Sequence, residues 1–153
     1  MAQTLAVAKC FNQMHQAEHK CAMDQMKMHK MMYLVQRESL MISRMPLFAD
    51  EFEAWKYGPV LLSVREEYLT GHMFRGVYET LDDKVQKLVA FVYKRYDHYS
   101  AWELSTLSHA EYSWKQARRG LAENEAGHEK MSLTAMKTDA TREFLRRNGV
   151  VLA

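Results

Sequence analysis

The sequence has 153 residues, of which 48% are hydrophobic and 26% are charged, and its formal net charge is +2. This length allows one domain with a hydrophobic core, and the composition excludes a disordered chain. No run of about 18 apolar residues is present, so we expect no membrane-spanning helix. The small net charge does not indicate a nucleic-acid-binding protein, because such proteins usually carry a clustered basic face.

The N-terminal sequence MAQTLAVAKC does not combine a basic segment with a long apolar block. It therefore does not have the pattern of a secretory signal peptide, and we expect a cytoplasmic protein. Cys10 and Cys21 have no CxxC partner, which predicts free thiols in a reducing compartment.

Glycine and proline are scarce, at 6 and 2 residues, which favours helices. Capping residues and helical spacing of apolar side chains predict a first helix from Thr4 to His19 and a second from Asp24 to Ser43. Gly58-Pro59 predicts the start of a third helix, with Pro59 at its first position.

Further along the chain, Gly71 predicts the end of the third helix, and residues 72–79 are expected to form a loop or a short extended segment. Capping sequences at residues 80–83, 100–103 and 113–116 and at Ser132 predict the later helices. Residues 121–131 are mostly polar and lack periodicity, which predicts a mobile loop. The predicted fold is therefore mainly α, a single compact domain over residues 1–153 with five to six helices and short extended or β elements around residues 47–58 and 73–79.

The segment PLFADEFEAWKYGPV, residues 46–60, is unusually aromatic for a connection between helices. It holds Phe48, Phe52, Trp55 and Tyr57, interleaved with charged side chains. Such a segment either packs into the core or presents a surface to a partner. We interpret it mainly as framework, in which case truncating Trp55 to alanine should cost about 3–5 kcal/mol.

Few residues have the spacing that catalysis or metal binding requires. His15 and His19 are four apart on a helix, but they lack the HExxH frame, so we predict no metal site and no cofactor. His109 and Glu111 could form an acid–base pair, but the alternative is that His109 satisfies free carbonyl groups at the end of a helix. We therefore predict that the protein is not an enzyme.

The chain contains 12 methionines, and five of them lie within residues 23–32. Methionine side chains adapt to irregular surfaces, so part of this cluster could bind a partner, although a core stripe is the commoner arrangement. The candidate contact residues are Met23, Met26 and Met28, together with Val151 and Leu152 in the C-terminal tail.

Two stretches of the sequence resemble one known family. They are KMHKMMYLVQRESLMISRMPLFADEFEAWKYGPVLLSVREEY, which begins at Lys27, and LSHAEYSWKQAR, which begins at Leu107. Together they resemble the Panacea domain, also called the SocA-like antitoxin or DUF4065 domain, from about Val7 to Phe144. Ser113 stands where that family commonly has proline. The matching motif positions are Glu53, Trp55, Lys56, Tyr57, Gly58, Pro59, His109, Glu111 and Trp114, with either a structural or a partner-binding role.

This resemblance implies an antitoxin of a toxin–antitoxin system, which neutralises a cognate protein toxin by direct binding. Two alternatives also follow from the resemblance. The first is a proteolytic adaptor that delivers a bound toxin to a AAA+ protease. The second is a phage-encoded protein that binds and inhibits a host defence factor.

Overall fold

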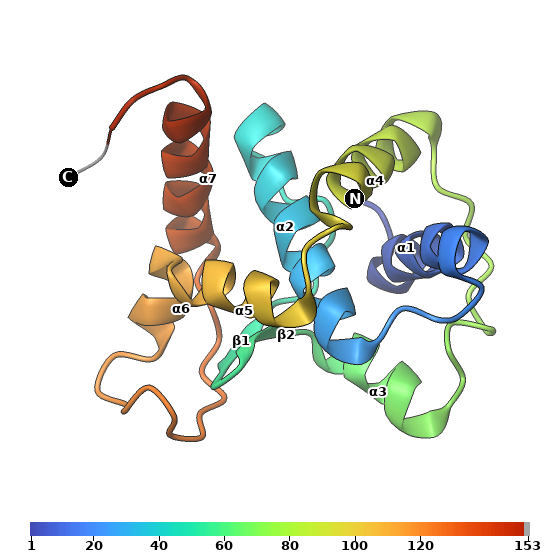
Figure 1. Ribbon diagram of the computed structural model, residues 1–153, viewed down its shortest axis with the longest axis horizontal. Coiled ribbons are helices and arrows are strands. Elements are labelled where there is room, and N and C mark those ends of the chain that lie inside the picture. Colours follow the sequence, from blue (N-terminus) through green and yellow to red (C-terminus); the bar gives the residue numbers. More distant parts are fainter. Residues whose placement is uncertain (152–153) are drawn as a thin grey trace.

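The computed structural model describes residues 1–151 and shows a helical domain built around one central helix (Figure 1). That helix, α2, has α1 and α4 on one side and α7 on the other, with α3 and a short hairpin near its N-terminal half. The elements in chain order are α1 (Thr4–His19), α2 (Gln25–Ser43), β1 (Glu53–Trp55), β2 (Gly58–Val60), α3 (Leu62–Thr70), α4 (Asp83–Tyr96), α5 (Ala101–His109), α6 (Tyr112–Ala117) and α7 (Leu133–Arg147).

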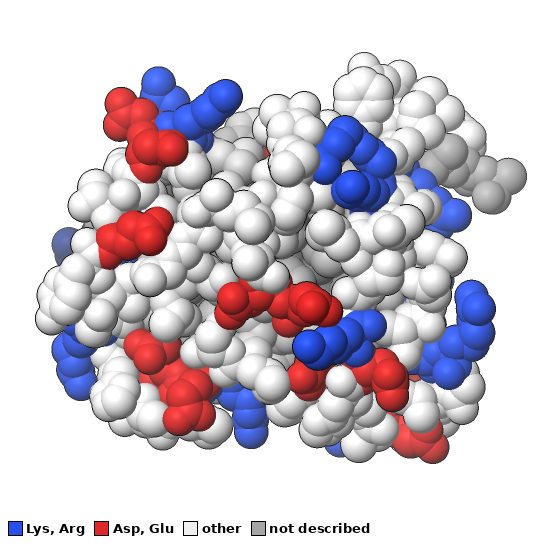
Figure 2. Space-filling view, turned by 180° about the vertical axis from the view of Figure 1, so that it is seen from behind, with Lys and Arg blue, Asp and Glu red and all other residues white. Residues whose placement is uncertain are grey.

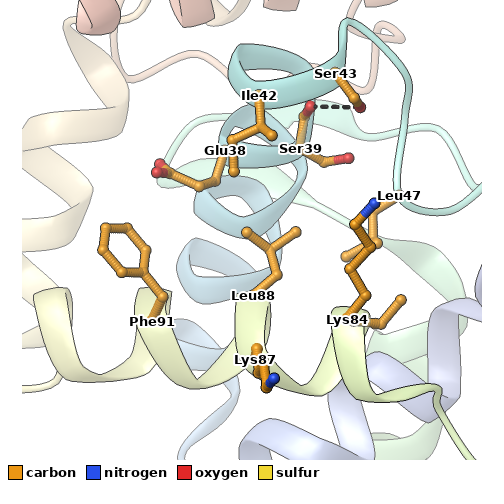
Figure 3. Close-up of a pocket in the computed structure, with 10 residues that line it drawn as sticks. Glu38, Ser39, Ile42, Ser43, Leu47, Lys84, Lys87, Leu88 and Phe91 are labelled. Carbon is orange, nitrogen blue, oxygen red and sulfur yellow. Dashed lines mark hydrogen bonds between the residues drawn. The ribbon is translucent and has the colours of Figure 1, made fainter.

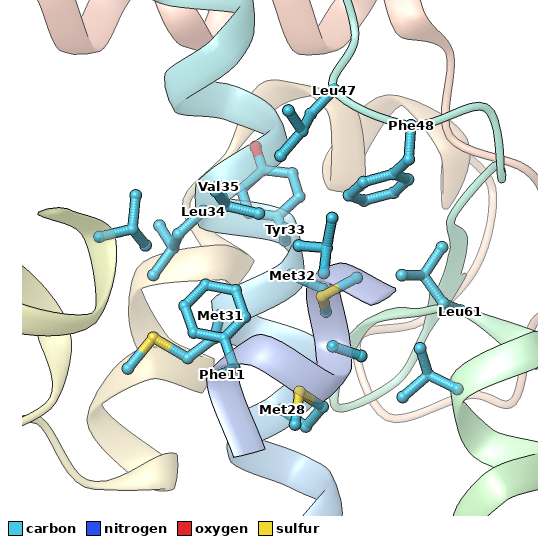
Figure 4. Close-up of a cluster of buried hydrophobic side chains, with 14 of the residues drawn as sticks. Phe11, Met28, Met31, Met32, Tyr33, Leu34, Val35, Leu47, Phe48 and Leu61 are labelled. Atoms are coloured by element: carbon cyan, nitrogen blue, oxygen red, sulfur yellow. The ribbon is translucent and has the colours of Figure 1, made fainter. Parts of the chain in front are cut away.

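Helix α2 is central because every residue from Met28 to Leu40 is buried. Its start is fixed locally, since the side chain of Asp24 accepts a hydrogen bond from the backbone N–H of Lys27. A helix that is buried on all sides must pack against several neighbours, and α2 contacts α1, α4, α5 and α7. Its apolar side chains meet Phe11 of α1 and Phe48 and Leu61 of the following segment (Figure 4).

The aromatic segment forms an antiparallel β-hairpin rather than the start of a helix. Residue pairs Glu53–Val60, Ala54–Pro59 and Trp55–Gly58 face each other across its two strands. The prediction that Pro59 occupies the first turn of the third helix is therefore wrong, because α3 begins at Leu62. Proline is tolerated in this short strand because it lies at the edge of a sheet.

The start of α3 is positioned from α2 rather than by a local capping residue. The backbone N–H of Leu61 donates to Nδ1 of His29, 3.2 Å away. Burial, with Lys30 and Arg65 nearby, lowers the pKa of His29 to about 3, so its ring is neutral and can accept this bond.

The mainly α, single-domain fold is confirmed, but residues 1–151 contain seven helices instead of five or six. The expected extended element within residues 47–58 corresponds to β1 and the start of β2. Residues 73–79 form turns and irregular backbone instead of a strand. There, Phe74 is fully buried with a positive φ of 67°, and its N–H donates to the carboxylate of Glu67.

Residues 121–131 connect α6 to α7 without forming a helix. The end of this loop lies beside β1: the N–H of Ala54 donates to the carbonyl of Glu129, and the N–H of Met131 donates to that of Phe52, each at 2.8 Å. The side chain of Arg118 donates to the loop carbonyls of Ala122 and Glu123. The mobility of this loop stays a prediction.

Candidate functional site

A buried lysine of α2 binds the backbone at the turn of the hairpin. Lys30 is only 3% exposed, and its Nζ donates a 2.5 Å hydrogen bond to the carbonyl oxygen of Tyr57. The hydroxyl of Ser105 in α5 donates to the same oxygen at 3.0 Å. Burial lowers the pKa of Lys30 to about 8, because a desolvated ammonium group favours its neutral form. One carbonyl thus joins the hairpin to α2 and α5.

Gly58 follows that carbonyl and lies directly against the lysine. Its φ is +122°, a conformation that favours glycine. A Cβ atom at this position would lie 2.7 Å from Nζ of Lys30 and 3.0 Å from the hydroxyl oxygen of Ser108. The close approach of the hairpin to α2 therefore requires glycine here.

A second set of contacts joins the hairpin to α6. Trp114 is buried, and its indole N–H donates to the carbonyl oxygen of Trp55 at 2.8 Å. The ring of His109 stacks on Trp114 with centroids 4.2 Å apart, and the guanidinium of Arg118 lies 5.1 Å from the same indole. Arg118 also donates to the carbonyl of Ala54 at 3.0 Å. Trp114 and Arg118 thus bind the backbone of β1.

The side chain of Trp55 is only partly buried, in contrast to that of Trp114. Its indole N–H donates to Glu53 at 2.9 Å, and its ring stacks on His128 of the 121–131 loop at 4.7 Å. Lys56 and Tyr57 at the turn are exposed. The outer side of the hairpin therefore offers aromatic and charged groups, while its backbone is fixed from the inside.

A buried charge cluster lies between α2, α5, α6 and α7. Nη1 of Arg37 donates to Glu111 at 2.9 Å, and the hydroxyl of Tyr33 donates to the other oxygen of Glu111 at 2.6 Å. Burial raises the pKa of Glu111, although the positive charge of Arg37 opposes this effect. Asp139 accepts from the backbone N–H groups of Tyr112 and Ser113, so α7 caps the start of α6.

The same cluster continues along α7. Arg147 forms a two-point ion pair with Glu38 of α2, at 2.7 and 2.9 Å, and also donates to Glu143 at 2.8 Å. Burial alone would raise the pKa of Glu143, but hydrogen bonds from Arg146 and the charge of Arg37 hold it at about 2. These contacts join the C-terminal helix to the central one.

His109 and Glu111, the candidate acid–base pair, bind different partners in the structure. His109 stacks on Trp114 and lies 3.4 Å from the hydroxyl of Ser105, and its pKa is lowered by burial and by Lys30. Glu111 is engaged by Arg37 and Tyr33. Within residues 1–151, no hydrogen bond or ion pair connects His109 to Glu111.

The predicted contact residues divide into buried and accessible ones. Met23 and Met28 are completely buried in the core, so their side chains are not accessible to a partner. Met26 is 37% exposed and Val151 is 93% exposed, so both stay available to a partner. Leu152 lies outside the described residues.

The sequence interpretation missed an apolar site between α2 and α4. Ile42 is 70% exposed and Phe91 is 47% exposed, and both line one groove. The available signal was the width of the apolar stripe in α4, where Leu88 and Phe91 lie beside the buried residues Val89 and Val92. A stripe wider than one packing face indicates that part of it lacks a partner within the fold.

His19, considered with His15 for metal binding, lies instead between two carboxylates. Nε2 of His19 is 3.6 Å from Glu18 and 3.7 Å from Asp97, and the three residues offer ligand atoms within 4.8 Å of one another. The ring of His15 lies 4.5 Å from that of His19, centroid to centroid, but its Nδ1 is 2.9 Å from the carbonyl oxygen of Cys21 and His15 is not part of this group. The ammonium of Lys27, 3.5 Å from Asp97, already supplies a cation to this group.

Charged side chains do not form one continuous surface of a single sign on the face shown in Figure 2. Lysine and arginine occur there in small groups, interspersed with aspartate and glutamate. This distribution differs from the basic stripe that binds nucleic acid. None of the helices in the described part of the chain is long and apolar enough to cross a membrane.

The fold and these contacts define a helical domain in which a short aromatic hairpin is held on the central helix by buried polar groups. The chain belongs to the antitoxin SocA-like, Panacea domain family, whose model matches residues 28–115. The matched part runs from α2 to α6 and includes the hairpin, Lys30, Arg37 and Trp114. The comparisons with curated proteins and with solved structures found no match.

Proposed function

We propose that this protein is an antitoxin that neutralises a cognate protein toxin by direct, non-covalent binding. The observation that carries the proposal is the family match over residues 28–115, which covers the hairpin and the core that holds it. The proposal concerns binding, because masking a toxin requires a complementary surface and no catalytic residues.

The accessible side chains fit a protein that binds another protein. Tyr57 is exposed at the hairpin turn, Ile42 is exposed on α2 and Phe91 is exposed on α4. Aromatic and large apolar side chains supply much of the binding energy at protein interfaces. In this proposal the buried motif residues provide the framework, and exposed residues around them contact the toxin.

Co-expression tests this proposal directly. The product of the gene adjacent to this one is expressed from an inducible promoter, with and without this protein, and growth is measured. We expect growth arrest by that product alone, rescue by this protein, and co-purification of the two as a stoichiometric complex. Continued arrest in the presence of abundant folded protein would refute neutralisation of that toxin.

Two further readings of the same experiment address the alternatives. The paired substitutions His109→Gln and Glu111→Gln keep hydrogen-bonding groups in place while removing the acid and base. Glu111→Gln also removes the counter-charge of the buried Arg37, so a lower melting temperature is expected and circular dichroism must show that the variant is folded at the growth temperature. Rescue by this folded variant would argue against an enzymatic mechanism. If rescue instead requires a AAA+ protease and the toxin level falls, the protein is an adaptor and not a stoichiometric inhibitor.

A further inference from the structure

An apolar groove lies between α2 and α4. Its volume is about 430 Å³, within the range of about 300–1,000 Å³ typical of ligand-binding pockets. Leu47 and Leu88 line its interior, while Ile42 on α2 and Phe91 on α4 stand on facing sides (Figure 3). We call this site the α2–α4 groove.

Ile42 and Phe91 make this groove different from scattered apolar surface. Single exposed apolar residues are ordinary on soluble proteins. Here two large side chains, 70% and 47% exposed, flank an apolar interior that is continuous with the core through Leu47. Contiguous exposed apolar surface with a polar rim marks a site of interaction.

The charged side chains at the rim of the groove indicate the sign of the charge that its partner should carry. Lys84 and Lys87 line the α4 side and are exposed, and neither takes part in an ion pair within residues 1–151. Glu38 also lines the groove, but Arg147 binds both of its carboxylate oxygens. The groove therefore presents net positive charge, which complements an acidic partner.

The helices that form the walls of the groove indicate which backbone conformation a bound segment should have. Both walls are helices, and backbone N–H and C=O groups within a helix bond to each other. The groove therefore offers no free strand edge with which an extended peptide could pair. A helix satisfies its own backbone groups and can lay an apolar face into such a groove.

We propose that the α2–α4 groove receives an amphipathic helix of the toxin, whose apolar face packs between Ile42 and Phe91 and whose acidic residues face Lys84 and Lys87. This inference rests on the proposed antitoxin function and names the surface that carries it out. It also adds a contact surface to the predicted one around Met26 and Val151, and this added surface lies within the region matched by the family.

The apolar part of the proposal is tested with two matched double variants and the purified adjacent-gene toxin. Ile42→Ala with Phe91→Ala removes the groove side chains, and Leu69→Ala with Trp102→Ala removes exposed apolar side chains outside it. Calorimetric titration should show affinity reduced at least about 30-fold in the groove variant only, the factor that corresponds to a hot-spot residue. Equal melting temperatures would exclude unfolding as the cause.

The charged part is tested by reversal of charge. Lys84→Glu with Lys87→Glu should slow toxin association and weaken its dependence on salt, because steering by opposite charges is lost. The control is Lys94→Glu with Lys115→Glu, which changes the net charge equally at exposed positions outside the groove. Similar effects from both pairs would attribute the change to net charge and overturn this part.

These experiments distinguish a wrong assignment of the groove from a wrong proposed function. If the wild-type protein rescues growth and the groove variants bind the toxin equally well, the groove inference is wrong and the antitoxin function stands. If size-exclusion chromatography shows a wild-type dimer that the groove variant lacks, a second copy of this chain occupies the groove. If the wild-type protein neither rescues growth nor binds the toxin, the proposed function fails and this inference fails with it.

Discussion

The amino group of Lys30 occupies the space into which a side chain at position 58 would project. A Cβ atom added to Gly58 would lie 2.7 Å from Nζ and 2.9 Å from Cε of that lysine. The lysine is in turn fixed by its hydrogen bond to the carbonyl of Tyr57. The backbone conformation of the hairpin at Gly58 therefore depends on the position of the buried ammonium group of Lys30 in α2.

Replacing Gly58 by alanine should strongly destabilise the fold. The positive φ alone costs about 1–3 kcal/mol for a residue with a Cβ, and the contact with Lys30 adds to this cost. Gly76 provides the matched control, because an added Cβ there meets nothing within 4 Å. Urea unfolding of Gly58→Ala and Gly76→Ala should show a large loss of stability in the first variant only. Similar stabilities would show that the hairpin can move away from α2 at little cost.

Lys30 should also give the protein an unusual gain of stability in alkaline solution. The folded-state pKa of Lys30 is about 8, below its ordinary value of 10.5. Between these two pH values the unfolded chain retains a proton that the folded chain has released, so stability rises with pH. At about 1.4 kcal/mol per pH unit between the two pKa values, the expected gain between pH 7 and pH 10 is about 2.5 kcal/mol.

The variant Lys30→Met separates this gain from the titration of other groups. It keeps a side chain of similar length and leaves the Ser105 hydroxyl bound to Tyr57. The stability of the wild type relative to the variant should rise from pH 7 to pH 10, as measured by urea unfolding at each pH. A pH-independent difference would show that Lys30 titrates like an exposed lysine.

The two tryptophans of the motif should differ in their effect on stability. Trp114 is buried and donates to the backbone of β1, so Trp114→Ala should cost about 3–5 kcal/mol. Trp55 is only partly buried, which lowers our expectation for Trp55→Ala to about 1–2 kcal/mol because less apolar area is removed from water. Thermal unfolding measures both. A larger loss for Trp55→Ala would place that indole in the core.

The bounds of α2 could be predicted because the signals are local: Asp24 caps the helix, and apolar residues follow its period. Pro59 was misplaced because a Gly-Pro pair can begin a helix or form part of a hairpin. The deciding contact comes from Lys30, 28 positions before Gly58. The family motif and an extended element within residues 47–58 could thus be predicted from the sequence, but the pairing of Gly58-Pro59 in a second strand could not.

The same limit applies to the candidate contact surface. Met23, Met26 and Met28 are close in the sequence, yet only Met26 is exposed, because tertiary neighbours decide which side chains are covered. The exposure of Ile42 and Phe91 depends on the distance between α2 and α4, which periodicity does not give. Local patterns therefore predicted the helices but not the groove between them.

The carboxylate of Glu143 should make the fold sensitive to acid. Its folded-state pKa is about 2, below the ordinary value of 4.5, so its ionised form stabilises the fold at neutral pH. This contribution is present above about pH 4.5 and is lost as the pH falls toward 2, when the carboxylate becomes protonated. Glu143→Gln should therefore be less stable than wild type at pH 7, by about 2 kcal/mol, and nearly equal to it at pH 2. Glu66→Gln, at an exposed position on α3, provides the control in the same denaturation series. A constant difference between wild type and Glu143→Gln across this range would mean that the ion pairs with Arg146 and Arg147 contribute nothing to acid sensitivity.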